Sequence, residues 1–234
     1  MKRFAILATI VVTGLLAACL GSQQPEPLAL ERLHDTLFVI SGGGGNSAVF
    51  VRAEGVVLVD TKVANTGQGL VDVIRSVTDK SITHIVNTHS HFDHIGSNGY
   101  FPASVEVVAH ENAAAQMVHR EELLDASTKH GLADRTFKDR LTLFSDDDAI
   151  DLHYFGAAHT SGDAFVVFRA LRVMHAGDTY PGLNPVTRDG GSAEAYPATM
   201  SKAAALTGIE TVIPGHGSVA TWQQFVEDVK KMGR

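Results

Sequence analysis

The sequence predicts an α/β (α+β) fold in which two β-sheets form a sandwich with helices on the outer faces. Short apolar, β-branched runs are followed by helical patterns, and this succession of strands and then helices occurs twice along the chain. The chain has 234 residues, of which 44% are hydrophobic, so it can bury a substantial core as one domain. No internal repeat or heptad pattern points to another architecture.

The first half of this fold begins with three short strands and a helix. Strands are expected at Thr36–Ile40, Ser47–Arg52 and Gly55–Asp60, where β-branched residues lie between turn residues. Ala53-Glu54-Gly55 would form the hairpin turn between the last two strands. Apolar residues spaced three and four positions apart then predict a helix over Gly67–Val77.

Two more strands and a helix complete the first half. The strands are predicted at Ile82–Asn87 and Val105–Ala109, and the segment Glu111–Asp125 is predicted to be helical. A second set of strands is then expected at Thr142–Phe144, Ala149–Phe155, Ala164–Arg169 and Arg172–His175.

The chain closes with a helix, a strand and a second helix. Ser192–Leu206 is predicted to be helical, and Thr211–Ile213 is predicted to be a short buried strand. An amphipathic helix is expected over Thr221–Met232, with Thr221 as its N-cap because its hydroxyl can accept from a free backbone N–H.

The N-terminus has the features of a leader. A short positive segment, Met1-Lys2-Arg3, precedes the apolar stretch Phe4–Ala18, which is too short to span a membrane comfortably. Leu16-Ala17-Ala18-Cys19 resembles the bacterial lipobox, in which a signal peptide (here residues 1–18) is cleaved before a lipid-modified cysteine. An ordinary secretory leader is the alternative. Residues 19–32 would then form a flexible linker, and residues 33–234 the folded domain.

Charge and cysteine content limit the classes of partner that this chain is expected to bind. Cys19 is the chain's single cysteine, so no disulfide is expected, and a lipid on Cys19 would be the only contact with a membrane. We expect an exported bacterial protein, periplasmic or anchored as a lipoprotein. The net charge is −7 and no basic stripe is present, which argues against nucleic acid as a partner. A small-molecule substrate is expected, and no obligate protein partner is evident.

The densest chemical feature is the run Thr88-His89-Ser90-His91-Phe92-Asp93-His94. Three imidazoles and a carboxylate lie within six positions, and these are ligands that Zn²⁺ and similar cations prefer. The run directly follows the predicted strand Ile82–Asn87, so it lies on a loop at a strand end, where α/β layers place ligands. A polar turn with incidental histidines is the alternative.

This run resembles the His-x-His-x-Asp-His signature of the metallo-β-lactamase superfamily of metallohydrolases. Further ligand-bearing motifs of that family, here called stations, follow in the same order, each after an apolar run. They are Ala157–Asp163 with His159, Met174–Thr179 with Asp178, and Ile213–Gly217 with His216. The resemblance covers the chain from about Leu33 onward. It implies a four-layer αβ/βα sandwich with metals at one edge of the two sheets.

The resemblance also implies a binuclear site. The first metal would be held by His89, His91 and His159. The second metal would be held by Asp93, His94 and His216, and Asp178 would bridge the two. We expect two zinc ions per chain, with iron or manganese as alternatives. Each ion would have about three protein ligands and an open position for water, as catalytic zinc sites do.

Roles are also predicted for three further residues and one loop. Asp60 matches a family aspartate that would hydrogen-bond a ligand imidazole, although it is as readily a strand-ending turn residue. Asp93, besides ligating, would orient the attacking hydroxide or pass its proton to the leaving group. Tyr180 would act as an oxyanion donor, with packing in the core as its alternative. The run Gly42-Gly43-Gly44-Gly45-Asn46 would be either a mobile flap over the site or a plain turn between strands.

The predicted function is metal-dependent hydrolysis of a carbonyl bond in a small molecule: a lactone, thioester, ester or β-lactam. Asp178 stands where β-lactamases with a cysteine ligand carry a thiol, and a bridging aspartate is typical of glyoxalase II-like and lactonase-like branches. One alternative is a mononuclear iron, sulfur dioxygenase-like oxidoreductase on the same fold. Another is a non-catalytic metal-binding lipoprotein.

Overall fold

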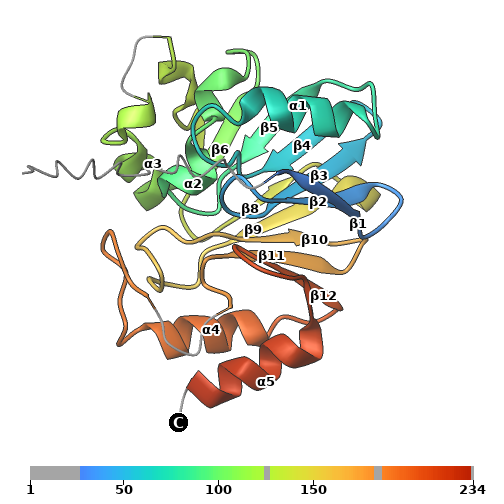
Figure 1. Cartoon of the computed structure of the whole chain (residues 1–234). Coiled ribbons are helices and arrows are strands. Elements are labelled where there is room, and N and C mark those ends of the chain that lie inside the picture. The colour runs from blue at the N-terminus through green and yellow to red at the C-terminus, as the bar shows by residue number, and fades with distance from the viewer. Residues whose placement is uncertain (1–26, 124–126, 182–185, 233–234) are drawn as a thin grey trace, which may run out of the picture.

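Two β-sheets pack face to face, and helices cover the outer face of each sheet, so that the chain forms four layers (Figure 1). The computed structural model describes residues 27–123, 127–181 and 186–232. The predicted signal peptide and Cys19 lie outside the described residues. Among the described helices, none combines the length and the apolar character that crossing a bilayer requires.

The first sheet has seven strands within the described residues, in the order β1-β2-β3-β4-β5-β6-β7. Strands β1 to β4 pair antiparallel, and β4 to β7 pair parallel. Their bounds are β1 Ala29–Arg32, β2 Leu37–Ser41, β3 Ser47–Arg52, β4 Gly55–Val59, β5 Ile82–Val86, β6 Glu106–His110 and β7 Arg135–Phe137.

The second sheet has six strands within the described residues, in the order β13-β12-β11-β10-β9-β8. Its strands pair antiparallel except β11 and β12, which run parallel. Their bounds are β8 Arg140–Leu143, β9 Ile150–His153, β10 Phe165–Phe168, β11 Val173–Gly177, β12 Thr211–Pro214 and β13 Ala220–Thr221.

Helices α1 (Gly67–Arg75) and α3 (Glu111–Met117) cover the first sheet, and α4 (Tyr196–Ala204) and α5 (Trp222–Met232) cover the second (Figure 1). The remaining helical segments are short: α2 Phe92–Ile95, η1 Asn98–Tyr100, η2 Glu121–Leu123, η3 Lys129–Gly131 and η4 Asp146–Asp148. The predicted N-cap of the last helix is confirmed, because Thr221 Oγ1 accepts from the backbone N–H of Gln224 at 3.2 Å.

The core has one apolar layer between the sheets and one beneath each helical layer. Strand β4 contributes side chains to two of these layers, the one between the sheets and the one beneath α1 and α3. Val57 and Val59 face the layer between the sheets, whereas Val56 and Leu58 face α1 and α3, because successive side chains of a strand point to opposite faces. All four side chains are fully buried, so the strand is fixed in register.

Two predicted helices are too long. Helix α3 ends at Met117, because the next positions on its buried side are Arg120 and Glu121, whose charged side chains are not buried in the core. Helix α4 begins at Tyr196 instead of Ser192. Pro197 lies in its first turn, where the missing N–H leaves no helical bond unmade.

The structure also contains strands that the sequence pattern did not predict. Strand β1 lies within the predicted linker, residues 19–32, and pairs with β2, with Leu30 opposite Ile40. Residues 29–32 are therefore part of the folded domain and not of a linker, since an extended segment beside an open sheet edge gains hydrogen bonds there. Strands β7 and β13 and helix α2 were likewise missed, being too short to show a period.

Candidate metal centre

The histidines and aspartates singled out in the sequence converge at the ends of strands from both sheets. His89 and His91 lie on the loop that leaves β5, and Asp93 and His94 lie in α2, which follows it. Asp178 follows β11 and His216 follows β12, and these two parallel strands bring the two residues to one edge of the second sheet. His159, Asp93 and the rest of the set complete two groups of ligand atoms, each within 4.8 Å: His89, His91, His159 and Asp178, and Asp93, His94 and His216.

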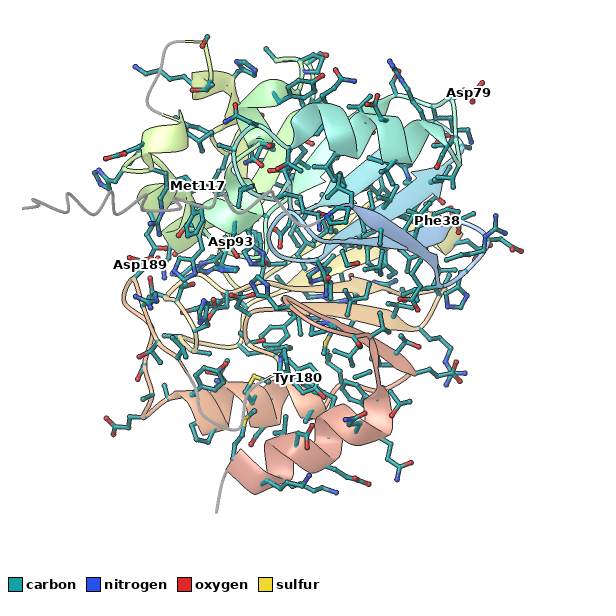
Figure 2. The ribbon with its side chains drawn as sticks, viewed as in Figure 1. Phe38, Asp79, Asp93, Met117, Tyr180 and Asp189 are labelled. Carbon is teal, nitrogen blue, oxygen red and sulfur yellow. The ribbon has the colours of Figure 1, made fainter. Side chains whose placement is uncertain are left out.

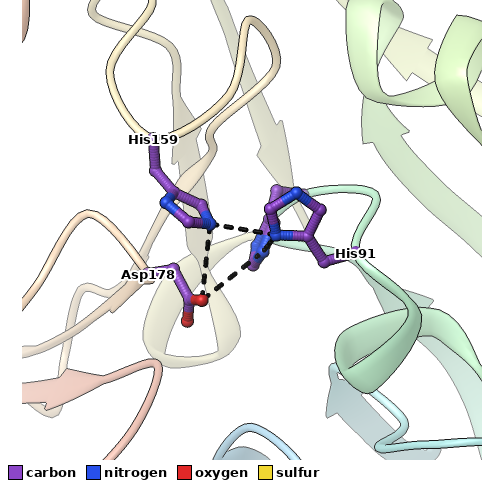
Figure 3. Close-up of side chains that lie close together, drawn as sticks. His91, His159 and Asp178 are labelled. Atoms are coloured by element: carbon purple, nitrogen blue, oxygen red, sulfur yellow. Dashed lines mark hydrogen bonds and ion pairs between the residues drawn. The ribbon is translucent and has the colours of Figure 1, made fainter. Parts of the chain in front are cut away.

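The first group is formed by three imidazoles and one carboxylate oxygen (Figure 3). His91 Nδ1 lies 3.1 Å from His89 Nε2 and 2.9 Å from His159 Nε2. Asp178 Oδ2 lies 3.4 Å from His159 Nε2 and 3.8 Å from His89 Nε2. Three ring nitrogens and an oxygen thus surround one point.

Asp178 also faces the second group through its other oxygen. Asp178 Oδ1 lies 3.1 Å from His94 Nε2 and 3.5 Å from His216 Nε2. Asp93 Oδ2 lies 3.1 Å from His216 Nε2 and 3.6 Å from His94 Nε2. The carboxylate of Asp178 therefore stands between the two groups, as the resemblance implied.

Hydrogen bonds on the outer side of the rings determine which nitrogen carries the proton. His91 Nε2 donates to Asp189 Oδ2 at 2.9 Å, and His159 Nδ1 donates to the carbonyl of Val186 at 2.7 Å. His94 Nδ1 donates to Asp60 Oδ2 at 2.7 Å. Whenever one of these rings is neutral, its other nitrogen is an unprotonated acceptor that faces the cluster.

The fourth ring, His89, is oriented through a hydroxyl. Thr88 Oγ1 donates its one proton to Asp60 Oδ2 at 2.7 Å, so it accepts from His89 Nδ1 at 2.9 Å. Asp60 Oδ1 also accepts from the backbone N–H of Thr88 at 2.8 Å. Asp60, fully buried, therefore fixes both His89 and His94. This contact matches the supporting role predicted for Asp60.

The arrangement of these nitrogen and oxygen atoms fits the binding of metal cations. Neutral rings held in these tautomers turn three lone pairs toward one another at about hydrogen-bond distance, with no proton between them. His94 Nε2 and Asp178 Oδ1 are buried 3.1 Å apart, and neither makes a well-formed hydrogen bond in the described part of the chain. Buried polar atoms without good hydrogen bonds are costly, and metal ions bound among them would satisfy them. The cluster is consistent with metal binding.

The charges of the two groups differ. Burial lowers the pKa of His89 well below its usual value and also lowers the pKa of His91, aided by neighbouring imidazoles. Hydrogen bonding to Asp178 and Asp93 raises the pKa of His216 to about 9. Burial opposes a rise at His94, but Asp60 and Asp178 outweigh it and bring that pKa to about 10.

The carboxylates of the cluster are ionised. Burial raises the pKa of Asp178, but the imidazoles of His216 and His94 outweigh it, so its pKa lies far below the usual range. The pKa of Asp93 is lowered in the same way, chiefly by His216 against the effect of burial. The negative charge needed to hold cations is therefore present at neutral pH.

Asp189 is a functional residue that the sequence pattern did not reveal. Its Oδ2 accepts from His91 and from the guanidinium of Arg120, and its carbonyl accepts from Gln116 Nε2 at 2.6 Å. Burial raises its pKa, but Arg120 and His91 outweigh this and lower it, so Asp189 is ionised. It holds His91 from outside the cluster, the position that carboxylate partners of metal-bound histidines occupy.

Tyr180 does not face the cluster, and the role predicted for it as an oxyanion donor is wrong. Its side chain is 3% exposed in the apolar layer beneath α5, and its hydroxyl donates to Asp228 Oδ2 at 3.1 Å (Figure 2). Burial and Asp228 raise its pKa to about 12. The alternative predicted for Tyr180, packing in the core, holds.

An open cleft of about 970 Å³ gives access to the first group. His91, Asp93, His159 and Asp178 line it. Exposed apolar side chains also line it, since Phe92 is 54% and Val186 is 57% exposed. Arg120, Arg188 and Asp189 complete the lining.

Comparison with known proteins agrees with this geometry. A model of the metallo-beta-lactamase superfamily matches residues 40–216, which include every residue of the two ligand groups. The chain belongs to the metallo-beta-lactamase superfamily. The family predicted from the four sequence stations is therefore confirmed.

Curated members of the superfamily resemble a limited part of the chain. Metallo-beta-lactamase domain-containing protein 1 of Rattus norvegicus is 35% identical over 71 residues, which are 30% of this chain and 28% of the rat protein. The Homo sapiens protein is also 35% identical over 71 residues, or 30% of this chain and 27% of its own length. The match thus spans well under half of these relatives.

Solved structures of the superfamily share the fold of nearly the whole chain. DIM-1 metallo-beta-lactamase exposed to ceftazidime superposes with a TM-score of 0.72 at 18% identity, covering 89% of this chain and 96% of that protein. A metallo-beta-lactamase from Pontibacter korlensis gives 0.72 at 17% identity, covering 88% and 99%. At this identity the likeness shows the fold, and the predicted metallo-β-lactamase sandwich is confirmed.

Replacing Asp189 should weaken the first metal site selectively. Asp189→Asn removes the charge that orients His91 and should reduce the affinity of that site for Zn²⁺ by about 10- to 100-fold. Competition with a chromophoric chelator measures this affinity. Exposed Asp79 provides a control, since Asp79→Asn makes the same chemical change away from the cluster. Equal affinities in both variants would contradict the role given to Asp189.

Acidification should release the second metal before the first. Metals bind neutral imidazole, and the raised pKa values of His94 and His216 let protons compete there at a pH at which His89 and His91 are still neutral. Equilibrium dialysis of zinc-loaded protein from about pH 8 to about pH 5 should show zinc content falling in two steps. The first step should be missing in His216→Ala. Simultaneous release of both ions would contradict this order.

Proposed function

We propose that this chain is a binuclear, zinc-dependent hydrolase that cleaves a carbonyl bond in a small molecule, such as a lactone, thioester, ester or β-lactam. One observation carries the proposal: the two oxygens of Asp178 face two separate groups of ligands, 3.4 Å from His159 in one and 3.1 Å from His94 in the other. A carboxylate in this position is what a pair of metal ions requires as a bridge.

Two zinc ions, when bound, would lower the pKa of a shared water and polarise the substrate carbonyl. The protein's own contribution is to hold the groups around that point. Asp93 lines the cleft, and its ionised carboxylate is placed to hold a proton and transfer it to the leaving group. No serine, cysteine or lysine stands among the described residues that line this cleft, which supports water as the nucleophile.

The cleft supports a small-molecule substrate. Its lining includes the apolar side chains of Phe92 and Val186 and the cationic side chain of Arg188. This combination suits a molecule with an apolar part and an anionic group. The absence of nucleic acid and of an obligate protein partner stays a prediction, as do export and the lipid anchor at Cys19.

The completeness of the second group favours hydrolysis over the iron-dependent alternative. A mononuclear site needs only one set of ligands, whereas Asp93, His94 and His216 form a second set beside the first. Metal analysis separates the hypotheses: two zinc ions per chain support the hydrolase, and one iron supports the dioxygenase-like enzyme. Bound metal without turnover of any substrate would favour the non-catalytic lipoprotein.

The direct test is a substrate panel with purified, zinc-loaded protein. Chromogenic β-lactams, acyl-homoserine lactones and glutathione thioesters sample the proposed carbonyl classes, and at least one should be hydrolysed. His91→Ala and Asp178→Ala should lower kcat/KM for that substrate by at least about 100-fold, since each removes a metal ligand. Zinc content per chain should be measured on the same samples.

The control for this panel is His119→Ala, which removes an exposed imidazole outside the cluster and should retain full activity. Hydrolysis that survives Asp178→Ala with unchanged kcat/KM would contradict the proposed mechanism.

A further inference from the structure

One ligand of the second group lacks the support that the others have. His89, His91, His94 and His159 each hydrogen-bond a partner through the outer ring nitrogen. No such bond is made by His216 Nδ1 within the described residues, and the His216 side chain is 49% exposed. Its position must therefore be set by the backbone that carries it.

Asn46 holds that backbone on both sides of His216. Its amide Nδ2 donates to the carbonyl of Pro214 at 2.9 Å and to the carbonyl of Gly217 at 2.9 Å. Its backbone N–H donates to the carbonyl of Gly215 at 2.6 Å. Asn46 is 3% exposed, so these bonds are shielded from water.

Asn46 is itself held by the fold. Its carbonyl accepts from Nε2 of buried His175 at 3.1 Å, and His175 Nδ1 accepts from the backbone N–H of Gly177, the residue before Asp178. His175 therefore connects Asn46 to the loop of the bridging carboxylate. Neither residue belongs to the ligand groups.

The glycine loop before Asn46, residues Gly42–Gly45, packs against the other imidazole of the second group. A Cβ on Gly45 would overlap the ring of His94, and a Cβ on Gly44 would lie 2.7 Å from the carbonyl oxygen of Asp93. Gly44 also has a φ of +119°, which side chains rarely adopt. Only glycine lets this backbone approach so closely.

Hydrogen bonds fasten the glycine loop in place. The Gly45 N–H donates to the carbonyl of Asp93 at 3.0 Å, and the carbonyl of Gly45 accepts from Nζ of fully buried Lys62 at 2.6 Å. Lys62 Nζ also donates to the carbonyl of Ile40 at the end of β2. The carbonyl of Gly43 also accepts from the backbone N–H of Val63 at 3.1 Å. A loop held at both Gly43 and Gly45 is a fixed support, which disfavours the mobile flap considered for this run.

We propose that Asn46 is a positioning residue for the second metal: it fixes His216 through the flanking carbonyls, while the adjoining glycine loop fixes His94. The inference rests on the two-metal site proposed above. It assigns affinity for the second ion to a residue that touches neither ion. The first metal's ligands do not contact Asn46, so their affinity should be independent of it.

Site-resolved metal binding tests this role. Asn46→Ala removes both side-chain hydrogen bonds, and Asn46→Asp keeps the size while losing the amide donors. Both variants should fold, since the backbone bonds of Asn46 to Gly215 and His175 remain. Stepwise Co²⁺ titration, followed by visible absorption, should show second-site affinity weakened by about 10- to 100-fold in both variants and first-site affinity changed by less than about 2-fold.

Ser47→Ala is the matched control. Ser47 is the neighbouring buried residue, and its Oγ has no hydrogen-bond partner within the described residues, so its removal should leave both affinities unchanged. His216→Ala and His159→Ala identify the absorption bands of the second and first site.

The outcomes separate the inference from the proposed function. Unchanged second-site affinity in both Asn46 variants would overturn the inference. Equal weakening of both sites would also overturn it, because that result indicates a general loss of stability. A wild-type chain that binds a single ion would overturn the two-metal function itself.

Discussion

Hydrogen bonds to the outer nitrogens of the imidazoles are the constraint on which the metal centre depends. Each of these bonds fixes a tautomer, and the fixed tautomers turn unprotonated nitrogens toward common points. Asp60 contributes most, because it orients His94 directly and His89 through Thr88. Without these partners the rings would rotate or exchange protons, and the lone pairs would separate.

The packing of the two sheets holds the loops that carry these imidazoles in place. Nitrogens in contact without protons repel one another, so the loops that carry them must be held by something stronger. Parallel strands β4, β5 and β6 and parallel strands β11 and β12 end at the same edge of the sandwich, and the apolar layer between the sheets holds them together. Asp60 has a φ of +60°, a strained conformation for a residue with a side chain, which is found where surrounding structure imposes it.

Much of the site could be predicted because its chemistry is local in the sequence. His89 to His94 are dense in metal ligands, and each later station follows an apolar strand, so strand ends and ligand types were both visible. Asp189 could not be predicted, because its role arises from contact with His91, 98 positions away. Tyr180 was placed wrongly because β11 ends at Gly177, where a φ of +53° turns the chain and sends Tyr180 into the core.

The fold class could be predicted from the sequence, whereas some boundaries of helices could not. Buried strands such as β4 have apolar runs that no exposed segment would show, whereas the ends of α3 and α4 depend on which neighbours they pack against. Asn46 looked like a turn residue, and its bonds to Pro214 and Gly217 become apparent only when the two sheets meet.

The most direct test of the account is anomalous diffraction at the zinc edge from crystals of the zinc-loaded protein. Two peaks about 3.5–4 Å apart, with the carboxylate of Asp178 between them, are predicted. The first peak should contact His89 Nε2, His91 Nδ1 and His159 Nε2. A single peak, or peaks that Asp178 does not touch, would contradict it.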